Sequence, residues 1–269
     1  MKGFQPPDYS LLDIPEISAT IFHPRKHWTP PPAQASDHRI EVEPGIEIGC
    51  RFYEHDKFAP TILYFHGNGE IVYDYDYPAS FYLKSEINLF VADFRGYGTS
   101  DGDPSIPSML ADAHTIFDNF RRVLDEKGFS GKIFVMGRSM GCNSAVELAA
   151  YYPEALSGLI AESGAASVSR WVDLLISKGK AEEATELERR HIEKVQSIAI
   201  PVLMIHGERD QLVPLARALE FYLILTTEDK ALETIPGAGH NDIMLIGWKK
   251  YFEAVNRFVH GSGPILRGT

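Results

Sequence analysis

The sequence is poor in cysteine and has no long apolar run. Cys50 and Cys142 are its only two cysteines, too few and too far apart for a disulfide framework or a zinc site, which favours a reducing cytoplasm. No run approaches the roughly 18 apolar residues of a membrane-spanning helix, so no transmembrane segment is predicted. The N-terminus, MKGFQPPDYSLLDIPEIS, has early prolines and no apolar core, and is therefore unlike a secretory signal.

Basic residues are outnumbered by acidic ones. The chain has 26 Lys and Arg against 37 Asp and Glu, a net charge of -11. Because nucleic-acid binding draws most of its affinity from clustered Lys and Arg, and no such cluster is present, a nucleic-acid partner is not expected. Hydrophobic residues make up 44% of the 269 residues, enough for the core of one large α/β domain.

The chain divides into an N-terminal arm, residues 1–37, and a single domain, residues 38–269. Prolines are frequent in the arm, which includes TPPPAQ, so we expect it to lie on the domain surface in extended form. The following stretch, HRIEVEPGIEIGCRFYEH, has two β-favouring runs around Pro44 and Gly45 and predicts an antiparallel hairpin.

Beyond the hairpin, short apolar runs end in glycine. Nearly continuous hydrophobicity is typical of strands that are buried on both faces, as in a parallel sheet. The runs are PTILYFHG, NLFVADFRG, KIFVMG, GLIAESG, PVLMIHG and ALETIPG.

Helix-like patterns alternate with these runs. Alternation of this kind predicts a doubly wound α/β fold with a mostly parallel sheet, whose ligands lie beyond the carboxyl ends of the strands. The expected helices cover about 70–84, 106–127, 140–151, 170–196, 214–226 and 241–259.

Ser139 lies in KIFVMGRSMGCNSAVELAAYYP, between a predicted strand and a predicted helix. This context is typical of a nucleophile elbow, in which glycines two residues before and after the serine let strand and helix approach closely. Gly137 and Gly141 occupy those positions. The N-terminus of the helix would stabilise an oxyanion, with the backbone N–H of Met140 as the first donor.

A serine nucleophile needs a base, a residue that orients the base, and a second oxyanion donor. His240, on the glycine-flanked loop GAGHNDI, is the predicted base. Asp210, four residues beyond the strand predicted at PVLMIHG, is the predicted acid that orients it. The backbone N–H of Asn68, after the pair His66 and Gly67, is the predicted second donor, with Gly69 as the alternative.

The segments FHGNGE, VADFRGYGTSDGDPS, GRSMGCNSA, IHGERDQLVP and GAGHNDI resemble successive motifs of the α/β-hydrolase superfamily. The resemblance covers residues 38–262 and includes the order Ser, Asp, His. Within the superfamily, HGNG and RGYGTSDG are similar to the small esterase, lysophospholipase-like and serine-aminopeptidase-like branch. This resemblance implies hydrolysis of an ester, a thioester or sometimes an amide, on a small-molecule acyl substrate, without a metal or an organic cofactor.

Other readings of the same residues stay open at this point. Glu162 is an alternative acid, since some superfamily members resemble a variant with the acid after this earlier strand. Cys142 is an alternative nucleophile, although its position on the first helical turn favours packing. Asp242 is expected to cap the last helix. Arg138, beside the predicted nucleophile, is expected to form a structural ion pair.

Substrate contacts are less defined than the reactive residues. Tyr73, Tyr75 and Tyr77 are candidates to line an acyl pocket, although packing explains them equally well. Residues 168–198 stand where superfamily members insert a cap and predict only a small one, with a solvated charged face. A serine peptidase of aminopeptidase type, with Glu70, Asp74 and Glu162 as amino-group ligands, is the second hypothesis. The third is a noncatalytic binding protein on a hydrolase fold.

Overall fold

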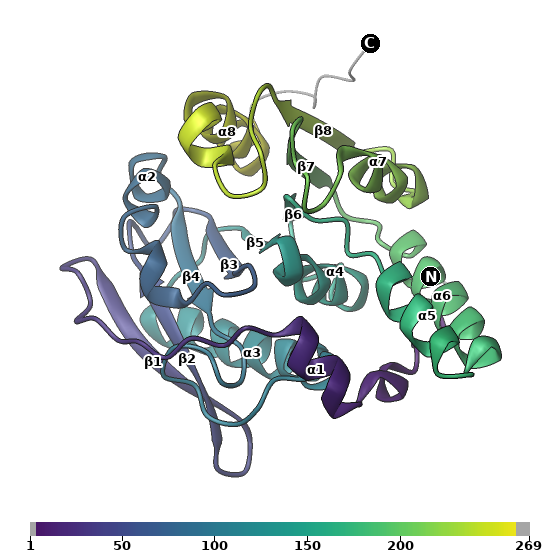
Figure 1. Cartoon of the computed structure of the whole chain (residues 1–269). Coiled ribbons are helices and arrows are strands. Elements are labelled where there is room, and N and C mark those ends of the chain that lie inside the picture. Colours follow the sequence, from purple (N-terminus) through teal and green to yellow (C-terminus); the bar gives the residue numbers. More distant parts are fainter. Residues whose placement is uncertain (1–3, 262–269) are drawn as a thin grey trace.

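A mixed eight-stranded sheet forms the centre of the computed structural model, which describes residues 4–261 (Figure 1). The strands are β1 Ala35–Glu43, β2 Ile46–Tyr53, β3 Thr61–Phe65, β4 Asn88–Ala92, β5 Ile133–Arg138, β6 Gly158–Glu162, β7 Val202–Gly207 and β8 Lys230–Ile235. Their order is β1-β2-β4-β3-β5-β6-β7-β8. Strands β3 to β8 run parallel, whereas β1 and β2 pair antiparallel, and β2 also joins β4 antiparallel. The predicted fold class and hairpin are confirmed.

The sheet follows from the apolar runs that the sequence predicts as strands. Every residue of β3, β4 and β6 is buried, as expected for strands covered by helices on both faces. The hairpin turns at Pro44 and Gly45, where Gly45 has a φ of +79°, a left-handed conformation that glycine adopts without Cβ strain.

Helices cover both faces of the sheet (Figure 1). Helices α2 and α8 lie together on one face, where the tilted rings of Phe81 and Phe252 contact each other with centroids 5.5 Å apart. Helices α3 and α4 lie on the other face. Within residues 4–261, none of these helices is both long and apolar enough to cross a membrane. The helices are η1 Tyr9–Leu12, α1 Pro15–Ile21, η2 Val72–Tyr75, α2 Ala79–Lys84, α3 Ile106–Lys127, η3 Ser139–Gly141, α4 Cys142–Tyr151, α5 Ser169–Ser177, α6 Ala181–Gln196, α7 Leu215–Ile224 and α8 Ile243–His260.

Two of the helices predicted from the sequence are each divided in the structure. Residues 70–84 form the 3-10 turn η2 and the short helix α2, which begins after Pro78 because proline has no N–H to continue an earlier turn. Residues 170–196 form α5 and α6, separated at Gly179, whose φ of +79° ends a right-handed helix.

The N-terminal segment is partly helical, where we expected an extended arm. The Asp8 carboxylate accepts a hydrogen bond from the Ser10 N–H and caps η1, and Pro15 lies in the first turn of α1. Leu12 and Ile17 are buried, so the segment contributes apolar side chains to the core. This contribution of buried side chains is why the segment forms helices.

A buried polar cluster joins the N-terminal segment to α6 and α4. The Tyr9 hydroxyl donates to His191 Nδ1 over 2.8 Å, because the other ring nitrogen of His191 donates to the Ala166 carbonyl over 2.7 Å. The Lys194 ammonium donates to the Tyr9 oxygen over 2.6 Å and to Glu147 over 2.5 Å. Burial lowers the pKa of His191 to about 3, so its ring is neutral.

The strand order brings several loops together at the carboxyl ends of the parallel strands. The chain leaves β3 for β4 on one side and returns to β5 on the other, so the loops after β3 and β5 separate at the switch between them. Loops after β7 and β8 reach the same edge, because parallel strands end on the same side.

Candidate active site

Ser139 occupies a strained turn between β5 and α4. Its φ of +51° lies in the left-handed region, which is uncommon for a residue with a side chain and is typical of a nucleophile elbow. A Cβ atom at Gly137 would lie 2.4 Å from the Gly141 carbonyl oxygen, and one at Gly141 would lie 2.2 Å from the Phe65 carbonyl oxygen. Gly137 therefore lets the strand pack against the start of α4, and Gly141 lets the turn pack against β3.

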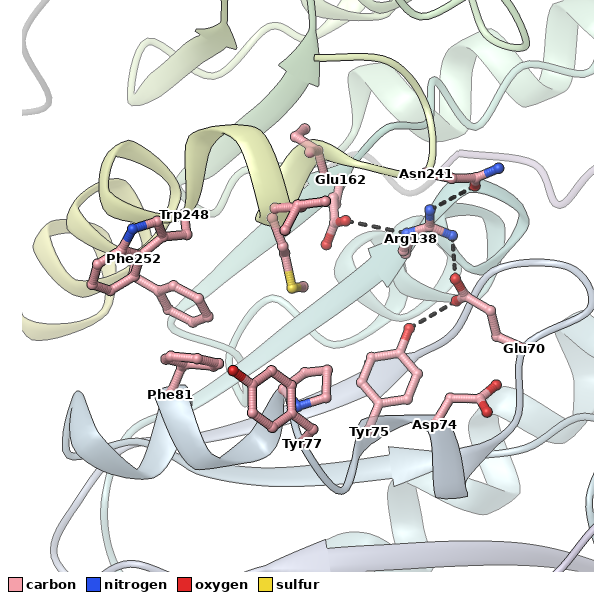
Figure 2. Close-up of a pocket in the computed structure, with 14 residues that line it drawn as sticks. Glu70, Asp74, Tyr75, Tyr77, Phe81, Arg138, Glu162, Asn241, Trp248 and Phe252 are labelled. Carbon is pink, nitrogen blue, oxygen red and sulfur yellow. Dashed lines mark hydrogen bonds and ion pairs between the residues drawn. The ribbon is translucent and has the colours of Figure 1, made fainter.

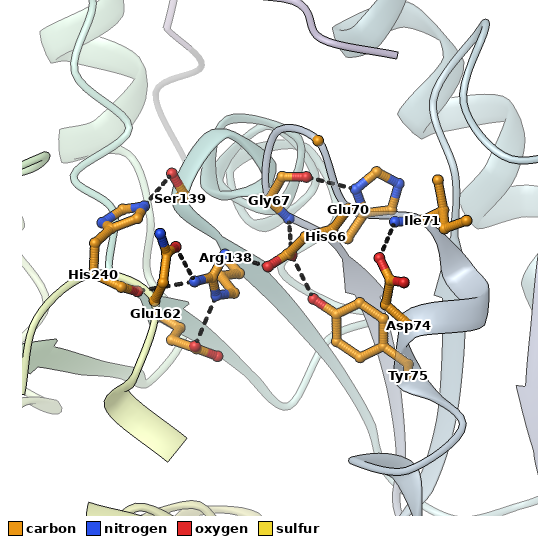
Figure 3. A network of polar contacts seen from close by, with 12 residues as sticks. His66, Gly67, Glu70, Ile71, Asp74, Tyr75, Arg138, Ser139, Glu162 and His240 are labelled. Atoms are coloured by element: carbon orange, nitrogen blue, oxygen red, sulfur yellow. Dashed lines mark hydrogen bonds and ion pairs between the residues drawn. The ribbon is translucent and has the colours of Figure 1, made fainter. Parts of the chain in front are cut away.

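The structure brings together the three residues that the sequence predicts as nucleophile, base and acid. Ser139 Oγ lies 3.0 Å from His240 Nε2 (Figure 3). His240 Nδ1 lies 2.7 Å from Asp210 Oδ2. Because the carboxylate accepts from Nδ1–H, Nε2 of a neutral ring is free to accept the hydroxyl proton. This hydrogen-bonded order is the geometry required for base-assisted attack by the serine.

Asp210 is held in place by the loop that carries it. Its Oδ1 accepts hydrogen bonds from the N–H groups of Leu212, at 2.9 Å, and Val213, at 2.8 Å. His206 donates from Nε2 to the Val213 carbonyl over 2.8 Å, and so supports the backbone of this loop. Burial lowers the pKa of its ring. The second oxygen of Asp210 is thereby directed at His240.

The loop that carries His240 is shaped by Asp242. Asp242 Oδ1 accepts a hydrogen bond from the Gly239 N–H over 2.6 Å. Asp242 stands at the N-cap position of α8, but its side chain makes no capping hydrogen bond to that helix. The prediction that it caps the helix is therefore wrong. The carboxylate has turned back because the Gly239 N–H, in the tight turn before His240, is the donor within its reach.

The loop after β3 carries the two candidates for the second oxyanion donor, the N–H groups of Asn68 and Gly69. The Gly67 N–H, just before them, donates to Glu70 Oε2 over 2.7 Å. His66 contacts the Gly67 carbonyl through Nδ1, at 2.8 Å, and Asp93 through Nε2, at 3.0 Å, so its ring supports the backbone of this loop.

The Asn68 side chain binds the N-terminal segment, which the sequence does not indicate. Its Oδ1 accepts from the His23 N–H over 3.0 Å and from the Tyr97 hydroxyl over 2.6 Å, and its Nδ2 donates to the Ile21 carbonyl. Arg25 adds a hydrogen bond of 3.2 Å from Nε to the Gly69 carbonyl. The segment that follows α1 therefore supports the loop after β3.

Arg138 lies at the centre of a buried ionic network (Figure 3). Its guanidinium contacts Glu70 at 2.5 Å and Glu162 at 3.2 Å, and Nη2 donates to the His240 carbonyl over 2.9 Å and to Asn241 Oδ1 over 3.0 Å. The predicted ion pair is confirmed, and it also fastens the His240 loop to β5.

The rival acid and the rival nucleophile are both engaged elsewhere. Glu162 is fully buried, accepts from Tyr251 over 2.7 Å and Tyr64 over 3.2 Å, and faces Arg138 rather than His240. Cys142 is fully buried and donates to the Gly137 carbonyl over 3.1 Å. Burial raises the pKa of the Cys142 thiol, so little of the reactive thiolate forms.

In the part of the chain that the structure describes, no group of three or more His, Cys, Asp or Glu could hold a metal ion.

An apolar cavity of about 530 Å³ lies beside this network, between α2 and α8 (Figure 2). Tyr75 and Tyr77 line it, whereas Tyr73 packs against the Arg51 guanidinium at 4.5 Å. Trp171, on the predicted cap segment, is buried against Tyr9 and does not border the cavity.

Comparison with known proteins agrees with this architecture. The family model described as serine aminopeptidase, S33, matches residues 56–182 and 172–244. Protein bem46 of Schizosaccharomyces pombe is 28% identical over 234 residues, which cover 82% of this chain and 76% of that protein. The α/β hydrolase domain-containing protein 17B of Xenopus tropicalis is 30% identical over 220 residues, 80% of this chain and 72% of that protein. The solved structure of the Pyrococcus furiosus esterase Pf2001 has the same fold, with a TM-score of 0.71 at 19% identity over 88% of this chain and 98% of that one. The chain therefore belongs to the serine aminopeptidase S33 family of the α/β-hydrolase superfamily.

Proposed function

We propose that this hydrolase cleaves carboxylic esters through an acyl-enzyme intermediate on Ser139. The observation that carries the proposal is the hydrogen-bonded order of Ser139, His240 and Asp210 at the carboxyl edge of the sheet, with Ser139 partly exposed and the other two buried. A partly exposed hydroxyl with a neutral imidazole at hydrogen-bond distance is the arrangement that activates serine at neutral pH.

In the proposed reaction, Ser139 Oγ attacks the ester carbonyl carbon while its proton moves to His240 Nε2. Asp210 stabilises the resulting imidazolium through Nδ1–H. The bond to the leaving oxygen then breaks, and His240 returns the proton to that oxygen, which departs as the alcohol. Water, deprotonated by the same ring, then attacks the acyl carbon. The bond to Ser139 Oγ breaks, His240 returns the proton to that oxygen, and the acid is released.

The developing oxyanion would be held by the backbone N–H groups of Met140 and Asn68. Met140 lies at the start of the η3 and α4 helical segment, where the first N–H groups have no acceptor within the helix. We choose the Asn68 N–H as the second donor because the preceding N–H, of Gly67, already donates to Glu70 Oε2. Each such donor contributes about 10² to 10³ in kcat in serine hydrolases, so both matter to the proposed rate.

An aminopeptidase would need carboxylates that can take a substrate ammonium. The three candidates already face guanidinium groups: Glu70 and Glu162 pair with Arg138, and Asp74 pairs with Arg25. A paired carboxylate attracts a further cation weakly, because much of its field is neutralised. This pairing favours esters over aminoacyl amides.

The test compares Ser139→Ala with Cys142→Ala. We expect Ser139→Ala to fold, to lose labelling by a fluorophosphonate probe, and to lose hydrolysis of p-nitrophenyl acetate by roughly 10⁴-fold or more, because the attacking group is gone. Cys142→Ala should retain most of the turnover and the labelling. Turnover retained by Ser139→Ala would contradict the proposal, and faster hydrolysis of leucine p-nitroanilide than of the esters by the wild type would favour the peptidase.

A further inference from the structure

The loop that follows β6, residues 163–168, has a strained backbone; it is called the β6 loop below. Ser163 and Ala166 have φ angles of +48° and +42°, in the left-handed region that a residue with a Cβ atom enters only at a cost in free energy. Ser163 Oγ is also buried without a hydrogen-bond partner among the residues that the structure describes. A loop with these costs keeps its shape only where its surroundings hold it.

The β6 loop packs directly against the turn that carries Ser139. A Cβ atom at Gly164 would lie 2.7 Å from the Ser139 carbonyl oxygen and closer still to Cys142 Sγ, so only glycine lets the loop approach this closely. At the start of the loop, the Ser163 N–H donates to the Ile205 carbonyl over 2.9 Å, which fastens it to β7. A displacement of the loop would therefore change the packing around the Ser139 backbone.

His191, on α6, holds the other end of the β6 loop. Its Nε2–H donates to the Ala166 carbonyl over 2.7 Å, and its Nδ1 accepts from the Tyr9 hydroxyl over 2.8 Å. Because the Lys194 ammonium donates to the Tyr9 oxygen, the hydroxyl proton is left for His191. Tyr9 belongs to the N-terminal segment, which lies beside α6 (Figure 1). The N-terminal segment and α6 together therefore hold the strained residue Ala166.

We propose that His191 is a positioning residue: by holding the Ala166 carbonyl, it keeps the β6 loop against the turn at Ser139. The proposal deepens the proposed ester hydrolysis and rests on it. Without this hydrogen bond, Ala166 relaxes out of the left-handed region and Gly164 moves away from Ser139. A displacement on the order of 1 Å at the reacting atoms is enough to cost about 10²-fold in rate. We therefore expect loss of His191 to lower kcat roughly ten- to hundredfold with KM nearly constant.

Hydrolysis of p-nitrophenyl acetate is compared in His191→Leu and in a matched control, Leu187→Ala. Leu187 is buried one turn earlier on α6 and lines a groove with Asp8 and Leu11 instead of the β6 loop, so its truncation also lowers stability. We expect kcat to fall roughly tenfold or more in His191→Leu and by about twofold or less in Leu187→Ala. An unchanged kcat in His191→Leu, or an equal fall in both variants, would overturn the proposal.

Two further variants test the link through the strained loop. Glycine adopts a φ of +42° without Cβ strain, so in the Ala166→Gly background His191→Leu should lower kcat roughly threefold less than it does in the wild type. An equal fall in both backgrounds would overturn strain at Ala166 as the link. Tyr9→Phe removes only the hydroxyl that His191 accepts from, and serves where His191→Leu does not fold. Its kcat should fall about threefold, and an unchanged kcat would overturn the proposal.

Hydrogen exchange separates this proposal from the proposed catalysis, because it needs no turnover. In His191→Leu, the amide protons of residues 139–142 and 163–168 should exchange roughly tenfold faster relative to those of β4, whose exchange reports overall stability. In Leu187→Ala this ratio should equal that of the wild type. Faster exchange of both segments in His191→Leu, with a wild type that cleaves no ester, would contradict ester hydrolysis and leave the positioning contact standing. A lower kcat with unchanged exchange of both segments would overturn the proposal.

Discussion

Replacing Arg138 by leucine should destabilise the fold and do so in a pH-dependent way. The Arg138 side chain is 9% exposed and that of Glu162 is 0% exposed, so the substitution leaves Glu162 as a buried charge without its counter-ion. Removal of one partner of a buried ion pair costs about 3 to 5 kcal/mol of unfolding free energy. For a chain of this size, that loss lowers the Tm by on the order of 10 °C.

The pH dependence follows from the Glu162 carboxyl. Burial raises its pKa, and the Arg138 charge acts in the opposite direction, so removing Arg138 raises the pKa further. When the pKa of a carboxyl is higher in the folded than in the unfolded state, the folded state holds its proton to a higher pH. The free energy of unfolding then falls as the pH rises above the pKa of the unfolded chain, about 4.3 for glutamate. The loss caused by Arg138→Leu should therefore be larger at pH 7 than at pH 5, where Glu162 takes up a proton.

Urea denaturation at both pH values checks this reasoning. The double variant Arg138→Leu with Glu162→Gln should recover at least half of the stability lost at pH 7, because the unpaired charge is gone. The single variant should also have a lower kcat, since Arg138 holds the His240 carbonyl. A loss below about 1 kcal/mol at pH 7, or a larger loss that is equal at both pH values and unchanged by Glu162→Gln, would refute the reasoning.

Two further predictions concern the N-terminal segment. Asn68→Ala keeps the proposed oxyanion N–H but removes the side-chain hydrogen bonds to the N-terminal segment, so kcat for p-nitrophenyl esters should fall roughly ten- to hundredfold with KM nearly constant. The control is Asn119→Ala, on α3. An unchanged kcat in Asn68→Ala would contradict a positioning role for Asn68. Glu147→Gln leaves the buried Lys194 ammonium without its carboxylate and should cost about 3 to 5 kcal/mol at pH 7 in urea denaturation. Burial lowers the pKa of Lys194, so this loss should shrink as the pH rises toward 10 and the ammonium deprotonates; a loss that is constant from pH 7 to 10 would speak against a buried charge as its cause.

The sequence alone predicts the parallel sheet, because apolar runs ended by glycine are a local pattern. It also predicts the turn at Ser139, since Gly137 and Gly141 are needed by atoms a few residues away or on the adjacent strand. Helix boundaries were less well predicted. A continuous helical pattern at 170–196 is divided at Gly179, whose φ of +79° ends α5.

The local patterns of the sequence determined the strands and the loops that follow them. They therefore determined which residues lie at the carboxyl edge of the sheet. Only the tertiary structure decided that Asn68 binds the N-terminal segment, that Arg138 links Glu70 to the His240 loop, and that α2 and α8 enclose a cavity. These contacts join residues 45 to 102 positions apart, such as Asn68 with His23 and Arg138 with His240. Hydrogen bonds of that range depend on how the layers pack, and neither periodicity nor motif spacing encodes the packing.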